Sequence, residues 1–296
     1  MSKAILTLIV LLAAFSGIAQ SGGICGTATV TDIDGNDYNT VLIGSQCWMK
    51  ENLKTTKYRN GTSITYPGSN NTAWENNITG AYAWYDNDIS WKNLYGALYN
   101  WYAVNNVNGL CPTDWHIPND AEWTMLTNYA GGESVAGGKL KSTRIAPIAH
   151  PRWDSPNSGA TDQYGFSAFP GGYRSYVGSF YNMGSTGYWW SASESSATYA
   201  WIRRISYDHA YFYRYGSGKT YGFSVRCVRD EGGSIILLGD ANCDGNINVL
   251  DIITMINYIM SLNPEPFCFQ NADVNGDTNI NVLDVIGTIN IIMGLQ

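Results

Sequence analysis

The residues with the clearest chemistry are oxygen-bearing side chains near the C-terminal end, which occur twice with the same spacing. Segment 240–251 reads DANCDGNINVLD, and segment 273–284 reads DVNGDTNINVLD. Calcium takes about six to eight oxygen ligands. A 12-residue loop can supply them from side chains at positions 1, 3 and 5, a carbonyl at position 7 and a carboxylate at position 12. The repeat therefore predicts two calcium sites.

Each predicted calcium site uses five residues. The first site consists of Asp240, Asn242, Asp244, Asn246 and Asp251, and the second of Asp273, Asn275, Asp277, Asn279 and Asp284. Loop position 6 needs a left-handed backbone, which Gly245 adopts at low cost. The β-branched Thr278 at that position of the second loop should cost on the order of 1–2 kcal/mol, so we expect the second site to be weaker. The alternative is a pair of Asn/Asp-rich turns without metal.

The distribution of charge favours a cation in this tail. The chain has a net charge of −7, and no Lys or Arg follows residue 230. A bound cation would reduce the mutual repulsion of the acidic residues there. The rest of the chain has no basic stripe to neutralise phosphates, which argues against nucleic acid as a partner.

An apolar helix is expected behind each loop, over Ile252–Met260 and Val285–Met293. With both loops and no helix preceding them, residues 239–296 resemble a small all-α type I dockerin domain. The resemblance implies docking to a cohesin domain. In that family the recognition residues occupy loop positions 10 and 11, often Ser or Thr. The residues at those positions here are apolar: Val249, Leu250, Val282 and Leu283. This departure leaves open an apolar cohesin contact or an intramolecular packing role.

The N-terminal segment has the pattern of a secretory signal peptide over residues 1–19. Lys3 precedes an apolar run from Ala4 to Phe15, and small residues follow at Gly17 and Ala19. A membrane anchor is the alternative, but the run is shorter than the roughly 20 residues that a span needs. No later segment could span a bilayer, so we expect a secreted protein, free or attached at the cell surface. Export permits disulfides, and six cysteines allow about 15 pairings.

Residues 20–230 are expected to form one aromatic-rich domain, joined to the tail by a linker at 231–238. Asn119 with Glu122 forms a capping-box pattern and Gly131 ends the pattern, which predicts one helix. Its expected apolar residues are Met125, Leu126, Tyr129 and Ala130. A second helix is expected over Tyr95–Val104, and a short third after Ser134, weakened by Gly137 and Gly138. Expected strands are Val41–Ile43, Tyr188–Ser191, Ala200–Ile205, His209–Tyr215 and Gly222–Val228, the last three consecutive and antiparallel.

Several motifs of this domain resemble the Fibrobacter succinogenes major paralogous domain. They are DIDGNDY at 32–38, VLIGSQCWMKENL at 41–53, YGALYNW at 95–101, CPTDWHIP at 111–118, FPGGYR at 169–174 and GFSVRCVR at 222–229. That family is itself similar to the C-type lectin-like fold and to sulfatase-modifying-factor domains, through WHIPNDAEW at 115–123 and Arg226-Cys227. The resemblance implies an α+β fold: a mixed sheet, two helices and long loops. With it we favour the disulfides Cys25–Cys47, Cys111–Cys227 and Cys243–Cys268.

No catalytic residue is expected. The sequence has no G-x-S-x-G elbow and no H-E-x-x-H pair. His116 is expected in the core, and His150 and His209 at the surface. A glycosidase would need two facing carboxylates, but nothing in the sequence pairs the available ones, which include Glu51, Glu122, Asp162 and Glu194. The Glu-Pro-Asn and Trp-Asn-Asp motifs of calcium-dependent lectins are also absent from this domain.

The Tyr/Trp-rich stretch 188–221 has two interpretations: core packing, or a platform for sugar rings or protein side chains. We assign Trp189, Trp190 and Trp201 to the core. The candidate ligand-binding residues are Tyr207, Tyr211, Tyr213 and Tyr215.

The sequence thus favours a non-catalytic, secreted binding or adhesion module for a carbohydrate or protein ligand. It would be tethered through a calcium-loaded dockerin to a cohesin-type partner and would serve polysaccharide utilisation. The alternatives are a carbohydrate-active or protein-modifying enzyme of the same extracellular assembly, and a structural component of a surface layer.

Overall fold

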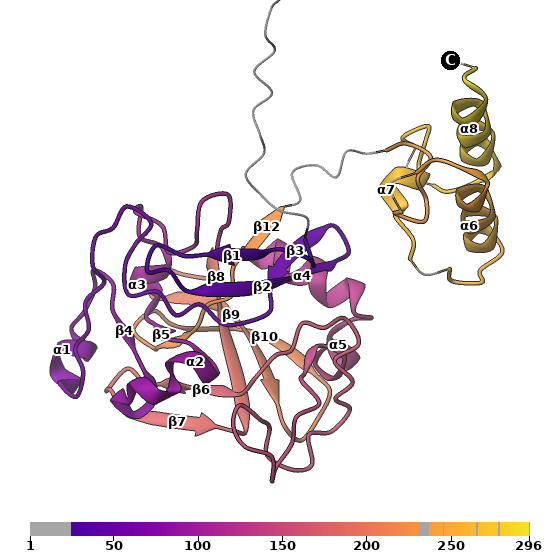
Figure 1. Cartoon of the computed structure of the whole chain (residues 1–296). Coiled ribbons are helices and arrows are strands. Elements are labelled where there is room, and N and C mark those ends of the chain that lie inside the picture. Colours follow the sequence, from indigo (N-terminus) through magenta and orange to yellow (C-terminus); the bar gives the residue numbers. More distant parts are fainter. Residues whose placement is uncertain (1–24, 231–236, 245, 265, 278, 296) are drawn as a thin grey trace, which may run out of the picture.

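The computed structural model describes residues 25–230, 237–244, 246–264, 266–277 and 279–295 (Figure 1). The expected signal peptide and most of the expected linker, residues 231–236, lie outside the described residues. In the described part, no helix is both long and apolar enough to cross a membrane. The larger domain is mostly sheet, and the smaller one consists of helices and loops.

The larger domain has twelve strands in the described residues. They are β1 (Thr29–Thr31), β2 (Asp37–Ile43), β3 (Gln46–Met49), β4 (Tyr82–Ala83), β5 (Leu98–Tyr99), β6 (Gly171–Arg174), β7 (Phe180–Met183), β8 (Thr186–Glu194), β9 (Tyr199–Ser206), β10 (Phe212–Gly218), β11 (Phe223–Ser224) and β12 (Val228–Asp230). Its helices are α1 (Asn71–Glu75), η1 (Tyr85–Asn87), η2 (Ile89–Trp91), α2 (Lys92–Tyr95), α3 (Trp101–Val104), α4 (Asp120–Tyr129) and α5 (Glu133–Leu140). The smaller domain has α6 (Val249–Ile259), α7 (Phe269–Ala272) and α8 (Val282–Met293).

One antiparallel sheet joins the two ends of the larger domain, in the order β1-β2-β3-β12. The expected strand Val41–Ile43 is confirmed as the second half of β2. The disulfide Cys25–Cys47 ties the segment before β1 to β3, and Cys111–Cys227 ties the loop before α4 to the residue preceding β12. The favoured pairings, including Cys243–Cys268 in the smaller domain, are all present. The first and last strands of the domain therefore share one sheet.

The second sheet has the order β10-β9-β8-β11-β5-β4, and β11 runs parallel to β8 while the other pairs are antiparallel. The expectation of three consecutive antiparallel strands at the end of the domain is therefore only partly right. β9 and β10 pair as expected, but segment 222–228 divides into β11 and the start of β12. β11 inserts between β8 and β5, a long-range pairing that local alternation cannot predict.

The capped helix is confirmed as α4. The Asn119 side chain accepts from the Glu122 N–H, and the Glu122 carboxylate accepts from the Asn119 N–H. Its expected buried face is partly wrong, because Met125 and Tyr129 are 50% and 49% exposed. Trp123 is fully buried in their place and contacts Trp48, Phe166 and Phe212.

The expected helix Tyr95–Val104 is wrong. Gly96 has φ = 78°, and a Cβ there would lie 2.8 Å from both Asn52 Cβ and the Leu53 carbonyl oxygen. This close approach turns the chain, so Leu98 and Tyr99 pair as β5 and a new helix, α3, starts at Trp101. The Asn100 side chain caps it by accepting from the Ala103 N–H.

The third expected helix, α5, forms in spite of its two glycines. A Cβ on Gly137 would lie 2.3 Å from the Tyr211 carbonyl oxygen, and one on Gly138 would lie 2.4 Å from the Gly159 carbonyl oxygen. These glycines therefore let two loops pack directly on the helix, which offsets their low helix propensity.

Two apolar clusters fill the larger domain, one around Trp101 and Trp190 and one around Trp48, Trp123 and Trp189. Trp189 and Trp190 are fully buried as expected. The expected core position of Trp201 is wrong. Trp201 is only half-buried, and the Arg214 guanidinium stacks on its ring at 3.5 Å. Because the charged guanidinium of Arg214 stays near solvent at the sheet surface, the ring on which it stacks is not fully buried.

The smaller domain has a much smaller core, formed by Ala241, Met255, Ala272 and Val285. α6 and α8 begin three residues earlier than expected, at Val249 and Val282, because Asn248 and Asn281 each cap a helix. In both helices the capping box is completed by an aspartate of the first turn, Asp251 or Asp284.

Candidate functional site

The oxygen ligands predicted for the first calcium site lie within one tight loop. Asp240 Oδ1 accepts from the Asp244 N–H at 3.1 Å, and the Asn242 side chain donates to Asp244 Oδ2 at 3.0 Å. Asp251, at the start of α6, accepts from the Asn242 N–H at 3.0 Å and from the Asn248 N–H at 2.8 Å. The carboxylate at loop position 12 is thereby directed toward residues at positions 1 to 5.

The second loop repeats these contacts 33 residues later. Asp273 Oδ1 accepts from the Asp277 N–H at 3.1 Å, and the Asn275 side chain donates to Asp277 at 3.1 Å. Asp284 accepts from the Asn275 and Asn281 N–H groups at 3.2 and 2.9 Å. The two predicted ligand sets therefore have the same geometry.

The buried carboxylates of these loops fit a bound cation. Asp251 and Asp284 are fully buried and Asp240 is 4% exposed, in a tail without any Lys or Arg. A buried carboxylate without a cation is costly. No group of three or more His, Cys, Asp or Glu side chains within the described ranges is arranged to hold a metal ion. A cation would thus also need the Asn and main-chain oxygens, which suit hard calcium.

The left-handed backbone of each loop is seen at position 4. Cys243 has φ = 63° and Gly276 has φ = 73°. The position-6 residues on which the expected ranking of the two sites rests, Gly245 and Thr278, lie outside the described residues. At position 4 the residue with a Cβ is in the first loop, so backbone strain there acts against that ranking. The ranking stays a prediction.

The four residues predicted to bind a partner are on the surface at the start of the two long helices. Val249, Leu250, Val282 and Leu283 are 61%, 53%, 64% and 58% exposed. The exposed apolar residues continue along both helices at matching positions: Ile253, Ile256, Ile259 and Met260 on α6, and Ile286, Ile289, Ile292 and Met293 on α8. Such contiguous exposed apolar area is typical of interaction sites. The intramolecular packing role left open by the sequence is not supported.

The histidines have structural partners. The expected core position of His116 is wrong, because its side chain is 41% exposed. Its Nε2 lies 2.7 Å from Glu122 Oε1. His150 Nδ1 lies 2.5 Å from the Tyr95 hydroxyl. His209 packs edge-on against Tyr211 and Tyr213.

The four carboxylates considered for catalysis each have their own local partner. Glu51 accepts from Asn39, Glu122 from Asn119, Asp162 from Ser167, and Glu194 from Lys219. These partners belong to four different parts of the domain. The structure therefore gives no reason to pair these carboxylates as a general acid and base.

The predicted tyrosine platform is only partly exposed. Tyr211 and Tyr215 are 46% and 36% exposed, and Tyr211 stacks on the half-buried Tyr213 with ring centroids 5.4 Å apart. Tyr207 does not fit the predicted ligand-binding platform, because it is half-buried and packs against the core cluster around Trp189.

A larger tyrosine surface includes Tyr215 and was not predicted from the sequence. It consists of Tyr173, Tyr176, Tyr181 and Tyr221, whose rings contact one another, together with Tyr199, a neighbour of Tyr221, and Tyr215, a neighbour of Tyr173. The Tyr173 ring lies 5.5 Å from that of Tyr181 and 6.0 Å from that of Tyr221, and Tyr176 lies 5.6 Å from Tyr221. Burial and the neighbouring phenols, among them that of Tyr181, raise the pKa of Tyr173. These tyrosines come from four separate segments, so no local pattern groups them.

An ion-pair triad holds β9 and β10 against α4. The Asp120 carboxylate lies 2.8 Å from Arg203 Nη1 and 2.8 Å from Arg214 Nη2. Burial raises the pKa of Asp120, but the hydrogen bonds and charges of Arg214 and Arg203 outweigh that effect and leave the pKa below its usual 3.8. These two arginines therefore serve the fold rather than a ligand.

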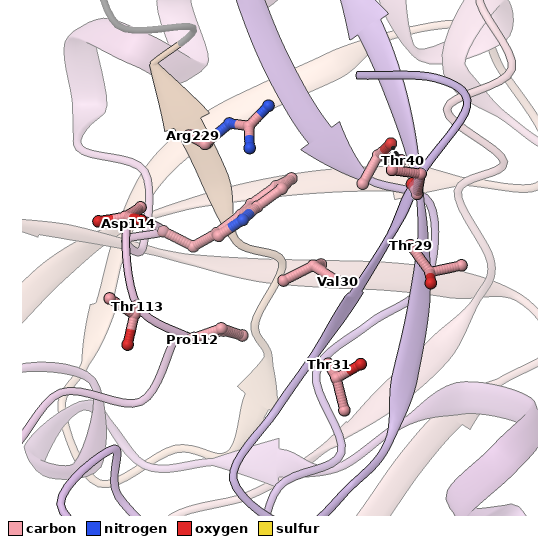
Figure 2. Close-up of a pocket in the computed structure, with 10 residues that line it drawn as sticks. Thr29, Val30, Thr31, Thr40, Pro112, Thr113, Asp114 and Arg229 are labelled. Atoms are coloured by element: carbon pink, nitrogen blue, oxygen red, sulfur yellow. Dashed lines mark hydrogen bonds between the residues drawn. The ribbon is translucent and has the colours of Figure 1, made fainter. Parts of the chain in front are cut away.

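A polar cavity of about 350 Å³ lies between β1, the loop after Cys111, and β12. Figure 2 shows Pro112, Thr113, Asp114 and Arg229 on one side of it and Thr29, Thr31 and Thr40 on the other. The Arg229 guanidinium lies 5.3 Å from the centre of the Trp115 ring, and Thr40 already bonds to Gly26 and Ala28. The cavity presents hydroxyl groups and one charge of each sign, a surface for polar ligands without catalytic geometry.

Comparison with known proteins identifies both parts of the chain. Residues 41–229 match the family model of the Fibrobacter succinogenes major domain, and residues 238–293 match that of the dockerin type I domain. Comparison with curated proteins and with solved structures gives no match. A type I dockerin indicates attachment to a cohesin partner in an extracellular complex, and such domains bind calcium. The chain belongs to the Fibrobacter succinogenes major domain family and carries a type I dockerin domain at its C-terminal end.

Proposed function

We propose that the chain is a secreted, non-catalytic binding or adhesion module whose larger domain holds a carbohydrate or protein ligand. Its dockerin, loaded with calcium at both loops, anchors that domain to a cohesin in an assembly for polysaccharide utilisation. The observation that carries the proposal is the pairing of a docking domain with a larger domain that has an exposed tyrosine surface. Three disulfides and the signal-like N-terminal segment support an extracellular site of action.

The ligand surface that we propose is the tyrosine surface. Tyr176, Tyr181 and Tyr199 are 48%, 46% and 50% exposed. Tyrosine rings supply flat apolar area at low entropy cost, and their hydroxyl groups supply hydrogen bonds. Together these properties suit the faces and hydroxyls of sugar rings, as well as extended protein segments.

The topology of the larger domain supports the proposed likeness to C-type lectin-like and sulfatase-modifying-factor folds. Strands from both ends of the domain share one sheet, and the Cys111–Cys227 disulfide closes that arrangement. α4 and α5 are the two helices of eight or more residues in the domain, in keeping with the two helices expected. Because fold alone does not fix function, this likeness supports only the use of loops and surface for binding.

The cohesin contact that we propose is centred on Val249, Leu250, Val282 and Leu283. Their exposure supports a partner with an apolar surface, in place of a partner that recognises the hydroxyl groups of Ser or Thr at these positions. Asp251 and Asp284, in the first turn of each helix, link calcium binding to the position of these residues. Calcium should therefore control the availability of the contact.

The docking half of the proposal is tested by a pull-down from cell-surface extracts with residues 20–296. Capture of one protein that is lost with EDTA, and lost in the double variant Val249→Asp/Val282→Asp, is expected. Ile148→Asp in the larger domain, where Ile148 is 47% exposed, is the matched control and should keep the partner. Capture that is indifferent to EDTA and to the double variant would contradict the proposal.

The binding half is tested by glycan-array and protein-array screening of the same chain. Tyr176→Ala and Tyr181→Ala should each weaken the ligand found by about 5-fold, the equivalent of roughly 1 kcal/mol for one aromatic contact. Tyr129→Ala removes an equally exposed tyrosine from α4 and should have no effect. Turnover abolished by one carboxylate substitution would favour the enzymatic alternative instead.

A further inference from the structure

A second cavity, of about 220 Å³, has a cationic lining unlike that of the rest of the domain. It lies between segment 51–54, helix α2 and the buried side chain of Arg226. Lys54, Lys92 and Arg226 are its basic residues, and Glu51 is its acidic one. The volume is below the usual range for drug-sized ligands, about 300–1,000 Å³. The cavity thus suits a small molecule.

Arg226, one of the residues that line this cavity, has a buried hydrogen-bond donor without a partner. Its side chain is fully buried, Nη1 donates to the Phe166 carbonyl, and Nη2 donates to Asn52 Oδ1 at 3.2 Å. Nε has no hydrogen-bond partner. The guanidinium also lies over the Phe166 ring, with its carbon 4.1 Å from the ring centre. Only two of the five N–H groups of this buried cation therefore have a hydrogen-bond acceptor within the described residues.

The charge of Arg226 is not neutralised by a contact. Within the described residues it forms no ion pair, and burial lowers its pKa to about 9 although Glu51 and Asp162 raise it from a distance. The Glu51 carboxylate is already held by the Asn39 main-chain and side-chain N–H groups, at 2.8 and 2.7 Å. An anion in the cavity would supply the missing counter-charge.

The two lysines add to this positive field. Lys54 Nζ lies 5.2 Å from the centre of the Tyr38 ring, and Lys92 Nζ lies 5.9 Å from that of the Trp84 ring. Neither lysine forms an ion pair in the part of the chain that the structure describes. With three cations against one acid, the lining is net positive in a chain whose overall charge is −7.

The remaining wall of the cavity is apolar. Leu94, Tyr95, Pro151 and Phe169 also line the cavity. An acidic ligand with a partly apolar body, such as a sugar ring bearing a carboxylate, would match both kinds of wall. Inorganic phosphate has no apolar part to place against this wall, so a carboxylic acid with an apolar body fits the lining better.

We propose that this cavity binds the carboxylate of a small organic acid or acidic sugar through Arg226, Lys54 and Lys92. The body of the ligand packs against Tyr95 and Phe169. The site is separate from the tyrosine surface and from the dockerin, and it gives the larger domain a preference for acidic ligands. Its chemistry is that of a uronic acid unit or of a free carboxylic acid.

Isothermal titration of residues 20–296 with sodium galacturonate, sodium glucuronate, sodium benzoate, glucose and sodium phosphate tests the proposal. Binding of the uronates without benzoate identifies an acidic sugar, and binding of benzoate as well identifies a general carboxylate site. Either result supports the proposal, and affinity should fall with added NaCl because the charges are partly exposed. Equal binding of glucose, stronger binding of phosphate, or no binding of any carboxylate overturns it.

Single variants locate the site. Lys54→Met and Lys92→Met should each weaken the carboxylate about 2- to 5-fold, as expected for partly exposed charges. Arg226→Met should abolish binding. Lys139→Met on α5 removes the same charge outside the cavity and should leave the affinity unchanged. If Arg226→Met does not fold, the double variant Lys54→Met/Lys92→Met decides, and unchanged affinity in it overturns the proposal.

Discussion

The most deeply buried charges of the two domains have opposite signs. The larger domain encloses Lys141, Arg174, Arg203 and Arg226, each at most 1% exposed, whereas the dockerin encloses Asp251 and Asp284. Lys141 Nζ donates to the carbonyls of Ser158, Ser206 and His209 at 2.8–3.0 Å. Arg174 lies over the Trp74 ring at 4.4 Å. The larger domain thus compensates its buried cations with carbonyls, aromatic rings and one carboxylate from its own chain.

The dockerin has no basic side chain to pair with its buried carboxylates. Its buried carboxylates accept main-chain N–H groups, and no lysine or arginine follows residue 230. Its core has four buried residues, while the clusters of the larger domain include nine fully or nearly fully buried tryptophans. Small cores need added staples such as a metal or a disulfide. From this comparison we expect the larger domain to be stable by itself and the dockerin to depend on a bound cation.

Calcium removal should give the largest difference in stability between the two domains. A ligand at 1,000 times its Kd stabilises the folded state by about 4 kcal/mol per site, so two sites should contribute roughly 8 kcal/mol. EDTA should therefore abolish the helical circular dichroism of α6 and α8 and leave tryptophan fluorescence unchanged. All 11 tryptophans precede the dockerin, which makes fluorescence specific for the larger domain. A fluorescence change of similar size would contradict the expectation that only the dockerin depends on calcium.

Loss of the Cys111–Cys227 disulfide should have the next largest effect. This disulfide closes a loop of 116 residues, for which chain entropy predicts a stabilisation of about 5 kcal/mol. Cys243–Cys268 closes only 25 residues in the dockerin, and about 3.5 kcal/mol is expected by the same relation. Urea titration of the double alanine variants, followed by fluorescence and by circular dichroism, measures both. A larger effect in the dockerin would reverse the expected order.

Breaking the Asp120 triad should destabilise only the larger domain. Asp120→Asn leaves Arg203, 1% exposed, without its counter-charge, at an expected cost of about 3 kcal/mol. The folded-state pKa of Asp120 is below its usual 3.8. Its stabilisation is therefore complete above the unfolded pKa and is lost as the pH falls through the folded value. The variant and the parent chain should therefore converge in urea titrations only when the pH falls below the folded-state pKa of Asp120.

Asp154→Asn is the matched control for the triad. Asp154 pairs with Arg152 at 2.8 Å, but its side chain is 45% exposed, so a loss of at most about 1 kcal/mol is expected. Equal losses of unfolding free energy in the two variants would show that burial does not determine how much these ion pairs contribute to stability.

The smallest expected effect concerns the difference between the two calcium loops. Gly276→Ala places a Cβ at φ = 73° in open space, which should cost about 1 kcal/mol and weaken the second site roughly 5-fold. Calorimetric titration of the full chain should also show the second site as the weaker one because of Thr278. Thr278→Gly should bring the two affinities together. Two equally tight sites in the parent chain would contradict this ranking.

The dockerin and the α4 helix were predictable because their signals are local. A calcium loop takes all its ligands from twelve consecutive residues, and the Asn119–Glu122 capping box spans four. The disulfide pairings were also right, although the family resemblance and not the spacing favoured them. In these cases the interacting groups are brought together by the chain itself.

The candidate ligand surfaces were predicted less well. Tyr215 was selected by alternation along one strand, but its neighbours Tyr173 and Tyr188 come from β6 and β8. Trp201 was assigned to the core by its type, whereas Arg214 from the neighbouring strand covers its ring. The helix expected over Tyr95–Val104 failed for the same reason, since contact between Gly96 and Asn52 turns the chain there.

The sequence by itself determined the two Asp/Asn-rich loops, the apolar helices behind them and the capped α4 helix, because residue spacing decides each of these within a few turns of chain. Only the tertiary structure decided which tyrosines form one surface and which cations surround Arg226. Those groups meet through strand pairing between distant segments, such as β11 with β8 and β5. Long-range pairing depends on the packing of the whole domain, and no local pattern encodes it.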